Sequence, residues 1–281
     1  MSTVNLPNDS KLNSNDFKLV CYKRRGTKLK PKSIHQNPIL QCADLPFVKE
    51  ASIRRILEAK LELSTTDLFD SVNASLQEGL SSLENPILSE IICLGLGKIG
   101  ECTIARYQFA LLLCLKELYK VDVCVYDPIF KEDDQTILNH FNIKVLKDNL
   151  EGKYKIQDKK TTVFYLPHCP SQLSNNLLWA NWGLDLNYCV IIANSFNKII
   201  ESCSTKTLKE NSEYILKISP YVLELAVINS FKFYEVFNDT AIHVFPKLNL
   251  IAPDLWEFCP EPKYSDEDTE FVTNTLNKLL I

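Results

Sequence analysis

The feature that most constrains this chain is a glycine-rich turn between an apolar segment and a helical pattern. The segment 91–94 has the composition of a buried strand, and Gly95, Gly97 and Gly100 follow it in the spacing Gly-x-Gly-x-x-Gly. A helical pattern opens at Glu101. The whole chain has only seven glycines, so three within one hexapeptide indicate a local demand on the backbone. A strand, such a turn and a helix are typical of the first unit of a nucleotide-binding fold.

Each glycine has an expected role in that turn. Gly95 permits the tight turn out of the strand, Gly97 lets the backbone approach a phosphate or ribose, and Gly100 lets the helix pack closely on the strand. The free N–H groups at the start of the helix favour an anion. Two interpretations stay open at this point: a nucleotide-type ligand site, and a packing turn that holds no ligand.

Apolar segments alternate with helical patterns along the chain, which predicts an α/β fold: a Rossmann-like, doubly wound, mostly parallel sheet. We expect residues 46–281 to form a single domain with a helical cover at 46–85, a sheet core at 90–246 and a C-terminal extension at 247–281. A helix is predicted to start after Ser265. The strands are expected at 91–94, 121–126, 143–146, 161–166, 189–193 and 241–245, with a helix-rich stretch at 206–230.

The N-terminal residues 1–45 lack periodicity and are predicted to form a disordered basic arm. Residues 1–46 carry eight Lys or Arg against three Asp, a net charge of +5 in a chain whose formal net charge is −4. The arm suits a nuclear localisation signal, a nucleic-acid contact or a solubilising tail, and we favour the tail. The acidic remainder of the chain argues against a nucleic-acid partner.

The ten cysteines include no Cys-x-x-Cys pair, and several lie in apolar runs. This pattern argues against a disulfide framework and against a zinc ribbon, so no metal site is predicted. No apolar run approaches the roughly 18 residues of a membrane span, and no membrane partner is expected. We therefore expect a reduced protein of the cytoplasm, with the nucleus as a second location.

Polar residues follow several predicted strands at the point where each strand ends. In a parallel sheet these carboxyl ends share one edge, which is where ligands bind. Asp127 has the place of a ribose-binding carboxylate, and an ordinary loop Asp before Pro128 is the alternative. The predicted cofactor-binding residues are Gly95, Gly97, Gly100, Asp127, His168, Cys169, Asn194 and Ser195.

The chemistry of this edge stays open. His168 is the one histidine placed to act as a general base or a ligand donor, and capping a strand end is its alternative role. Cys169-Pro170 and Cys259-Pro260 are dipeptides of the kind that offer a thiolate to haem iron. No catalytic constellation is apparent, so the sequence leans against an enzyme without excluding one. The cofactor is unknown, and either an unidentified small molecule or a regulatory protein is the expected partner.

Several of these motifs together resemble the SRR-like family, named for sensitivity to red light reduced. The resemblance covers about residues 17–246. One departure is Phe17, where the family's arm usually carries Trp. The matching segments are 91–100 (Ile-Ile-Cys-Leu-Gly-Leu-Gly-Lys-Ile-Gly), 126–128 (Tyr-Asp-Pro), 164–170 (Phe-Tyr-Leu-Pro-His-Cys-Pro), 181–182 (Asn-Trp), 192–196 (Ile-Ala-Asn-Ser-Phe) and 237–245 (Phe-Asn-Asp-Thr-Ala-Ile-His-Val-Phe).

The resemblance implies a regulatory protein linked to circadian rhythm, to haem biosynthesis and, in fungi, to microtubule-related processes. It implies no established catalytic activity. The alternative is an enzyme with a nucleotide-type cofactor. An S-adenosylmethionine-dependent methyltransferase usually has an acidic residue where this chain has Cys93, and an NAD(P)-dependent oxidoreductase would need a hydride-transfer constellation that is not apparent here.

Overall fold

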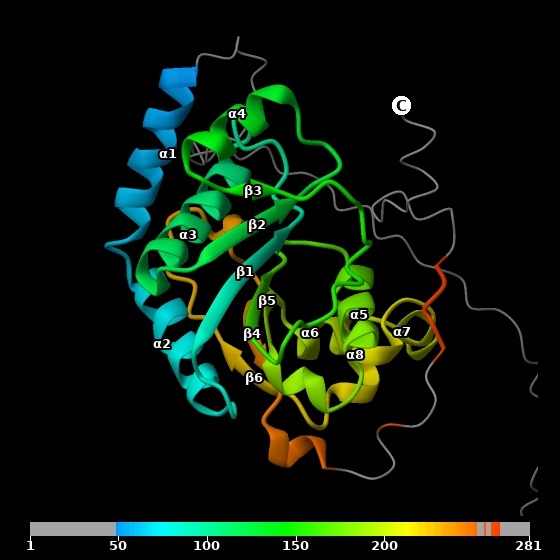
Figure 1. The fold of residues 1–281 in the computed structure, drawn as a ribbon. Coiled ribbons are helices and arrows are strands. Elements are labelled where there is room, and N and C mark those ends of the chain that lie inside the picture. The colour runs from blue at the N-terminus through cyan, green and yellow to red at the C-terminus, as the bar shows by residue number, and fades with distance from the viewer. Residues whose placement is uncertain (1–48, 252–255, 257–259, 265–281) are drawn as a thin grey trace, which may run out of the picture. The chain divides into compact units, whose positions relative to one another are not determined.

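A computed structural model describes residues 49–251, 256 and 260–264, all of which belong to one compact unit, Leu40–Ile281 (Figure 1). The predicted basic arm, Cys259 and the predicted helix after Ser265 lie outside the described residues. The strands run in chain order: β1 (Leu88–Leu94), β2 (Asp122–Tyr126), β3 (Lys144–Val145), β4 (Thr161–Tyr165), β5 (Cys189–Asn194), β6 (Leu223–Ala226) and β7 (Thr240–Val244).

The strands form one sheet in the order β3-β2-β1-β4-β5-β7-β6. The first five strands in that order are mutually parallel. Strand β7 is antiparallel to both β5 and β6. The predicted mostly parallel sheet is therefore confirmed, and β1 lies in the middle of the five parallel strands, with β2 and β4 on either side. Consequently the glycine turn after β1 lies between the carboxyl ends of two neighbouring strands.

Helices cover both faces of the sheet, as the doubly wound prediction requires (Figure 1). One face packs against α1, α2, α3 and α4, and the other packs against α5, α6 and α8. Successive residues of β1 alternate between the two cores, because side chains of a strand point to opposite faces. The helices are α1 (Lys49–Leu63), α2 (Asp67–Ser81), α3 (Thr103–Tyr119), α4 (Glu132–His140), α5 (Ser171–Ala180), α6 (Phe196–Ser202), α7 (Thr205–Asn211) and α8 (Glu213–Ile218), with 3-10 helices η1 (Leu184–Tyr188), η2 (Tyr234–Val236) and η3 (Lys247–Leu250).

The predicted helical cover is confirmed by α1 and α2. Thr66 caps α2, and its hydroxyl accepts a hydrogen bond from the Phe69 N–H at 3.3 Å. The buried leucines and isoleucines of α1 and α2 join the core on the face of the sheet that α3 and α4 also cover. Gly79 of α2 packs there against Val244 of β7.

The helix-rich stretch predicted at 206–230 is helical in its first part only. Helices α7 and α8 occupy 205–218, but β6 follows at Leu223–Ala226. The segment Leu-Glu-Leu-Ala has no strand propensity of its own, and its pairing with β7 decides its conformation. This strand places Glu224 beside β7, which matters below. Among the described residues, no helix is both long and apolar enough to span a bilayer.

Candidate functional site

The turn after β1 owes its glycines to backbone conformation and to a neighbouring sulfur. Gly95 and Gly97 both have φ of +73°, a region that side chains disfavour. A Cβ at Gly95 would lie 2.4 Å from Cys169 Sγ, whereas a Cβ at Gly97 would meet only Ala105 at 3.7 Å. Gly95 N–H also donates to the Tyr126 carbonyl at 3.0 Å. Gly95 is thus required twice over, while Gly97 is required by conformation alone.

The carboxylate of Asp127 is used to hold this turn in place. Its Oδ2 accepts the Gly97 N–H at 2.7 Å, and its Oδ1 accepts the Ile129 N–H at 3.0 Å. Burial raises the pKa of Asp127, and the two N–H donors offset only part of that rise. The ribose-binding role predicted for Asp127 stays a prediction, because one of its oxygens already bonds the turn and the other bonds the loop.

A second carboxylate, that of Asp134, accepts a hydrogen bond from the last glycine of the turn. Gly100 N–H donates to Asp134 Oδ1 at 3.2 Å. Asp134 Oδ2 in turn accepts the Lys131 N–H at 3.1 Å at the start of α4. The amides of Gly97 and Gly100, which the sequence offered to a ligand anion, therefore both face carboxylates of the protein itself.

The end of β4 brings His168 and Cys169 to the same edge of the sheet, with different surroundings. Cys169 is 8% exposed, and its thiol donates to the Leu94 carbonyl at 3.2 Å. Burial raises the pKa of this thiol, with Asp127 adding to the effect, so the neutral thiol is the form held here. Its sulfur packs against Gly95, which argues against the predicted thiolate contact with haem iron at this residue.

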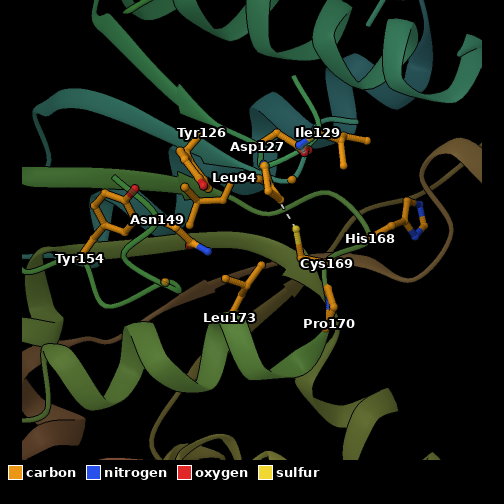
Figure 2. Close-up of a pocket in the computed structure, with 13 residues that line it drawn as sticks. Leu94, Tyr126, Asp127, Ile129, Asn149, Tyr154, His168, Cys169, Pro170 and Leu173 are labelled. Atoms are coloured by element: carbon orange, nitrogen blue, oxygen red, sulfur yellow. Dashed lines mark hydrogen bonds between the residues drawn. The ribbon is translucent and has the colours of Figure 1, made fainter. Parts of the chain in front are cut away.

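His168 has φ of +51°, an uncommon conformation for a residue other than glycine. Its Nε2 lies 3.0 Å from the Val236 carbonyl and donates to it. Figure 2 shows the imidazole at the edge of the site, away from Tyr126 and Tyr154 on the opposite wall. His168 thereby ties the end of β4 to the loop before β7.

The end of β5 supplies Asn194 and Ser195, which link neighbouring segments. Asn194 Nδ2 donates to the Cys169 carbonyl at 3.3 Å. Ser195 caps α6 by accepting the Lys198 N–H at 3.1 Å, and its hydroxyl donates to Glu224. Ser195 N–H donates to the Asp239 carbonyl at 2.7 Å. Both residues hold the edge of the sheet together.

A pocket of about 230 Å³ lies beyond the carboxyl ends of β1, β2 and β4 (Figure 2). Of the predicted residues, Gly95, Asp127, His168 and Cys169 line it. Gly97 and Gly100 are not among its lining residues, and Asn194 and Ser195 line a separate open notch that His168 also borders. The lining residues are Leu94, Gly95, Tyr126, Asp127, Pro128, Ile129, Asn149, Gly152, Tyr154, His168, Cys169, Pro170 and Leu173.

The sequence analysis missed one wall of this pocket, which comes from the polar loop between β3 and β4. Tyr154 is 8% exposed, and its hydroxyl has no hydrogen-bond partner among the described residues. Gly152 has φ of +82°, and a Cβ there would lie 2.6 Å from the Leu173 carbonyl. Asn181 holds the loop by donating to the Tyr154 carbonyl at 2.7 Å. A glycine and an aromatic residue inside an otherwise polar loop were the available signal.

The sequence analysis also gave His243 no role, although it lies at the centre of a buried cluster. His243 is fully buried on β7 and stacks on Phe196 with ring centroids 3.8 Å apart. Its Nδ1 lies 3.0 Å from the Ile191 carbonyl and its Nε2 lies 3.3 Å from Glu224 Oε2. No signal in the sequence pairs His243 with Glu224, because β6 was not predicted.

Glu224 is the carboxylate of this cluster. Burial pulls its pKa upward, but His243, the Ser195 hydroxyl and the Asn197 N–H outweigh burial and lower the pKa to about 2. Neither Glu224 nor His243 lines the pocket or the notch described above, so we interpret the cluster as a structural element of this edge rather than a binding site. Within the described part of the chain, no group of three or more His, Cys, Asp or Glu side chains is placed to hold a metal ion.

Comparison with known proteins places these residues within a family. The profile of the SRR1 domain matches residues 53–244, a range that includes every predicted site residue. The SRR1-like protein of Drosophila melanogaster is 28% identical over 94% of this chain and 95% of its own length. The SRR1-like protein of Mus musculus is 34% identical over 60% of this chain and 81% of its own length. The Arabidopsis thaliana protein Sensitivity to Red Light Reduced 1 is 25% identical over 56% of this chain and 58% of its own length.

Proposed function

We propose that this chain, which belongs to the SRR1 domain family, is a regulatory protein whose Rossmann-like domain binds a small molecule in the pocket of Figure 2. One observation carries the proposal. The pocket lies at the carboxyl ends of parallel strands, where Rossmann-like folds bind ligands, and its floor is built from the motifs that also carry the family resemblance. Those motifs supply Gly95, Asp127, His168 and Cys169.

The state of the polar groups supports binding rather than catalysis. Cys169 is held as a buried thiol that donates to the Leu94 carbonyl, and His168 is bonded to the Val236 carbonyl. Both candidates for a nucleophile or a general base are therefore engaged with backbone groups. A sensor that changes shape around a ligand needs no such group.

The finer role of the protein is also a proposal. The name of the Arabidopsis relative supports a link to red-light responses, and through the family to circadian rhythm. Links to haem biosynthesis and to microtubules are supported by the family resemblance alone. Location in the cytoplasm, with the nucleus as a second site, and a regulatory protein partner belong to the same proposal.

The test is to identify what the pocket retains. The protein is purified from its native cells, denatured, and the released small molecules are identified by mass spectrometry. Leu173→Trp fills the pocket from α5, so a genuine ligand disappears from this variant. Leu184→Trp is the matched control, because Leu184 is 51% exposed on η1 outside the pocket. Identical extracts from wild type and Leu173→Trp, together with no ligand-dependent change in melting temperature, would contradict the proposal.

One enzymatic alternative is favoured by a specific observation, the strand order. The common dinucleotide-binding order is 3-2-1-4-5-6, whereas here antiparallel β7 lies between β5 and β6, as in Rossmann-like methyltransferases that use S-adenosylmethionine. This is an analogy of fold and does not establish chemistry. Transfer of a labelled methyl group from S-adenosylmethionine to a cell extract, lost in Leu173→Trp and kept in Leu184→Trp, would place the methyltransferase first.

A further inference from the structure

The backbone groups that would bind a phosphate near this pocket already have anionic partners. Gly97 N–H donates to Asp127 at 2.7 Å and Gly100 N–H donates to Asp134 at 3.2 Å. A phosphate at the turn would have to displace both carboxylates and would leave them buried beside its own negative charge. Like charges in a poorly solvated site are strongly disfavoured.

The described lining of the pocket offers an anion no permanent positive charge. Among the described lining residues none is Lys or Arg. The carboxylate in this lining belongs to Asp127. Asp127 is itself 9% exposed, and burial already raises its pKa. A second negative charge in the pocket would add to the cost of ionising this group.

The remaining walls suit a flat, largely apolar molecule. Tyr126 and Tyr154 lie on one side (Figure 2), and Leu94, Ile129 and Leu173 supply aliphatic contacts. Aromatic rings stack on such walls with offset or edge-to-face geometry. A volume of about 230 Å³ limits the occupant to a small molecule.

One polar group of this wall lacks a partner within the protein. The hydroxyl of Tyr154 is buried and makes no hydrogen bond to any described residue. Buried polar groups are nearly always satisfied, and an exception calls for an unseen partner. The hydroxyl oxygen is closed to solvent in this structure, so a ligand acceptor supplies that partner only after the Tyr154 side chain moves toward the pocket.

We infer that the pocket binds a heteroaromatic molecule that carries a hydrogen-bond acceptor and no phosphate. Its ring lies between the tyrosine wall and Leu173, and a shift of the Tyr154 side chain on binding lets its acceptor bond the Tyr154 hydroxyl. Asp127 and Asp134 exclude phosphorylated relatives of the same ring by occupying the amides of the turn. This inference rests on the proposed function and adds the ligand class to it.

The test uses pairs of probes that differ only by phosphate. Adenosine with AMP, guanosine with GMP, and riboflavin with FMN are titrated into the full-length protein by calorimetry. A set of uncharged heteroaromatic fragments is screened in parallel by ligand-observed NMR. We expect fragment hits in wild type that vanish in Leu173→Trp and persist in Leu184→Trp. In every pair that binds, we expect the unphosphorylated member to bind at least tenfold more tightly.

Two variants separate the parts of the inference. Tyr154→Phe removes only the hydroxyl, so affinity for acceptor-bearing hits falls about tenfold, while Tyr221→Phe, outside the pocket lining, changes nothing. Asp127→Asn removes the negative charge, so the preference for the unphosphorylated member of a pair narrows. Circular dichroism and melting temperature establish that each variant is folded.

The outcomes distinguish this inference from the proposed function. Tighter binding of a phosphorylated member, lost in Leu173→Trp, would overturn the inference and leave the small-molecule pocket standing. Acceptor-bearing hits whose affinity is the same for the wild type and for Tyr154→Phe would overturn the role of the hydroxyl. No hit sensitive to Leu173→Trp would overturn both the ligand class and the proposed pocket function.

Discussion

In two regions at the same edge of the sheet a carboxylate accepts hydrogen bonds from neighbouring segments, but the pKa values of the two carboxylates shift in opposite directions. Beside β1, Asp127 accepts the N–H groups of Gly97 and Ile129, and burial raises its pKa. Beside β7, Glu224 accepts the Asn197 N–H and the Ser195 hydroxyl next to His243, and its pKa is lowered to about 2.

The difference lies in the partners of the two carboxylates. Asp127 has neutral backbone donors and an adjoining cavity, and Asp134 contributes a repulsive charge. Glu224 has an imidazole at 3.3 Å and lines neither the pocket nor the open notch. Backbone donors alone therefore do not offset the burial of a carboxylate here, and a side-chain partner does. The β1 region, called the open region below, adjoins the pocket, whereas the carboxylate of the β7 region, called the closed region below, lies outside it.

The largest expected effect comes from breaking the closed region. Glu224→Ala leaves the Ser195 hydroxyl and the Asn197 N–H without their acceptor and removes the carboxylate beside buried His243, and we expect a loss of about 3–5 kcal/mol in the free energy of unfolding. Urea denaturation measures it. The control is Glu213→Ala, whose partner Lys217 is surface-exposed, with an expected loss below about 0.5 kcal/mol. Equal losses in the two variants would contradict the structural role of the cluster.

The turn of the open region should respond to its two glycines unequally. Gly95→Ala introduces both a positive-φ strain and a Cβ 2.4 Å from Cys169 Sγ, and we expect a loss of about 3 kcal/mol. Gly97→Ala has the same φ but room for its Cβ, so about 1 kcal/mol is expected. Chemical denaturation gives both values. A double-mutant cycle with Cys169→Ala should recover part of the Gly95 loss and none of the Gly97 loss.

The two carboxylates should also differ in how they respond to acid. The folded pKa of Glu224, about 2, lies below its usual 4.5, so its contribution is complete above about pH 5 and is lost as the pH falls toward 2. That contribution is about 3 kcal/mol. Asp127 has a raised folded pKa, so its protonation favours the folded state as the pH falls.

Unfolding free energies measured from pH 7 to pH 2.5 test this opposition. Glu224→Gln should flatten the acid loss. Asp127→Asn should steepen it, because a compensating protonation is removed. A flatter acid limb in Asp127→Asn would show that the difference between the two regions has been misassigned.

The smallest expected effect concerns the unpartnered hydroxyl of the open region. Tyr154→Phe removes a buried group without a described partner, so the free energy of unfolding should change by less than about 0.5 kcal/mol or rise. Tyr214→Phe is the comparison, because its hydroxyl donates to the Pro260 carbonyl at 2.6 Å, and a loss of about 1 kcal/mol is expected. Thermal denaturation without ligand distinguishes them. A clear loss in Tyr154→Phe would mean that this hydroxyl already has a partner.

Residues that act through local backbone geometry could be predicted from the sequence. The strand, the turn at Gly95 and Gly97, and α3 follow from composition and spacing over a few residues, and the structure has them there. The edge that brings Asp127, Cys169 and Asn194 together follows from parallel topology. Whether the Gly97 N–H is free to bind a ligand could not be predicted from the sequence, because it depends on where a carboxylate thirty residues away places its oxygens.

Alternation of apolar strands and helices by itself determined that this chain forms a doubly wound, mostly parallel sheet with a glycine turn after its first strand, because those signals are local and repeat along the chain. Only the tertiary structure decided that β6 is a strand, that Glu224 meets His243, and that Tyr154 walls the pocket. Each of these depends on contacts between segments far apart in sequence, where packing and hydrogen bonding override local preference. The same reason explains why Asp127 and Asp134, rather than an open row of amides, determine which ligands the turn accepts.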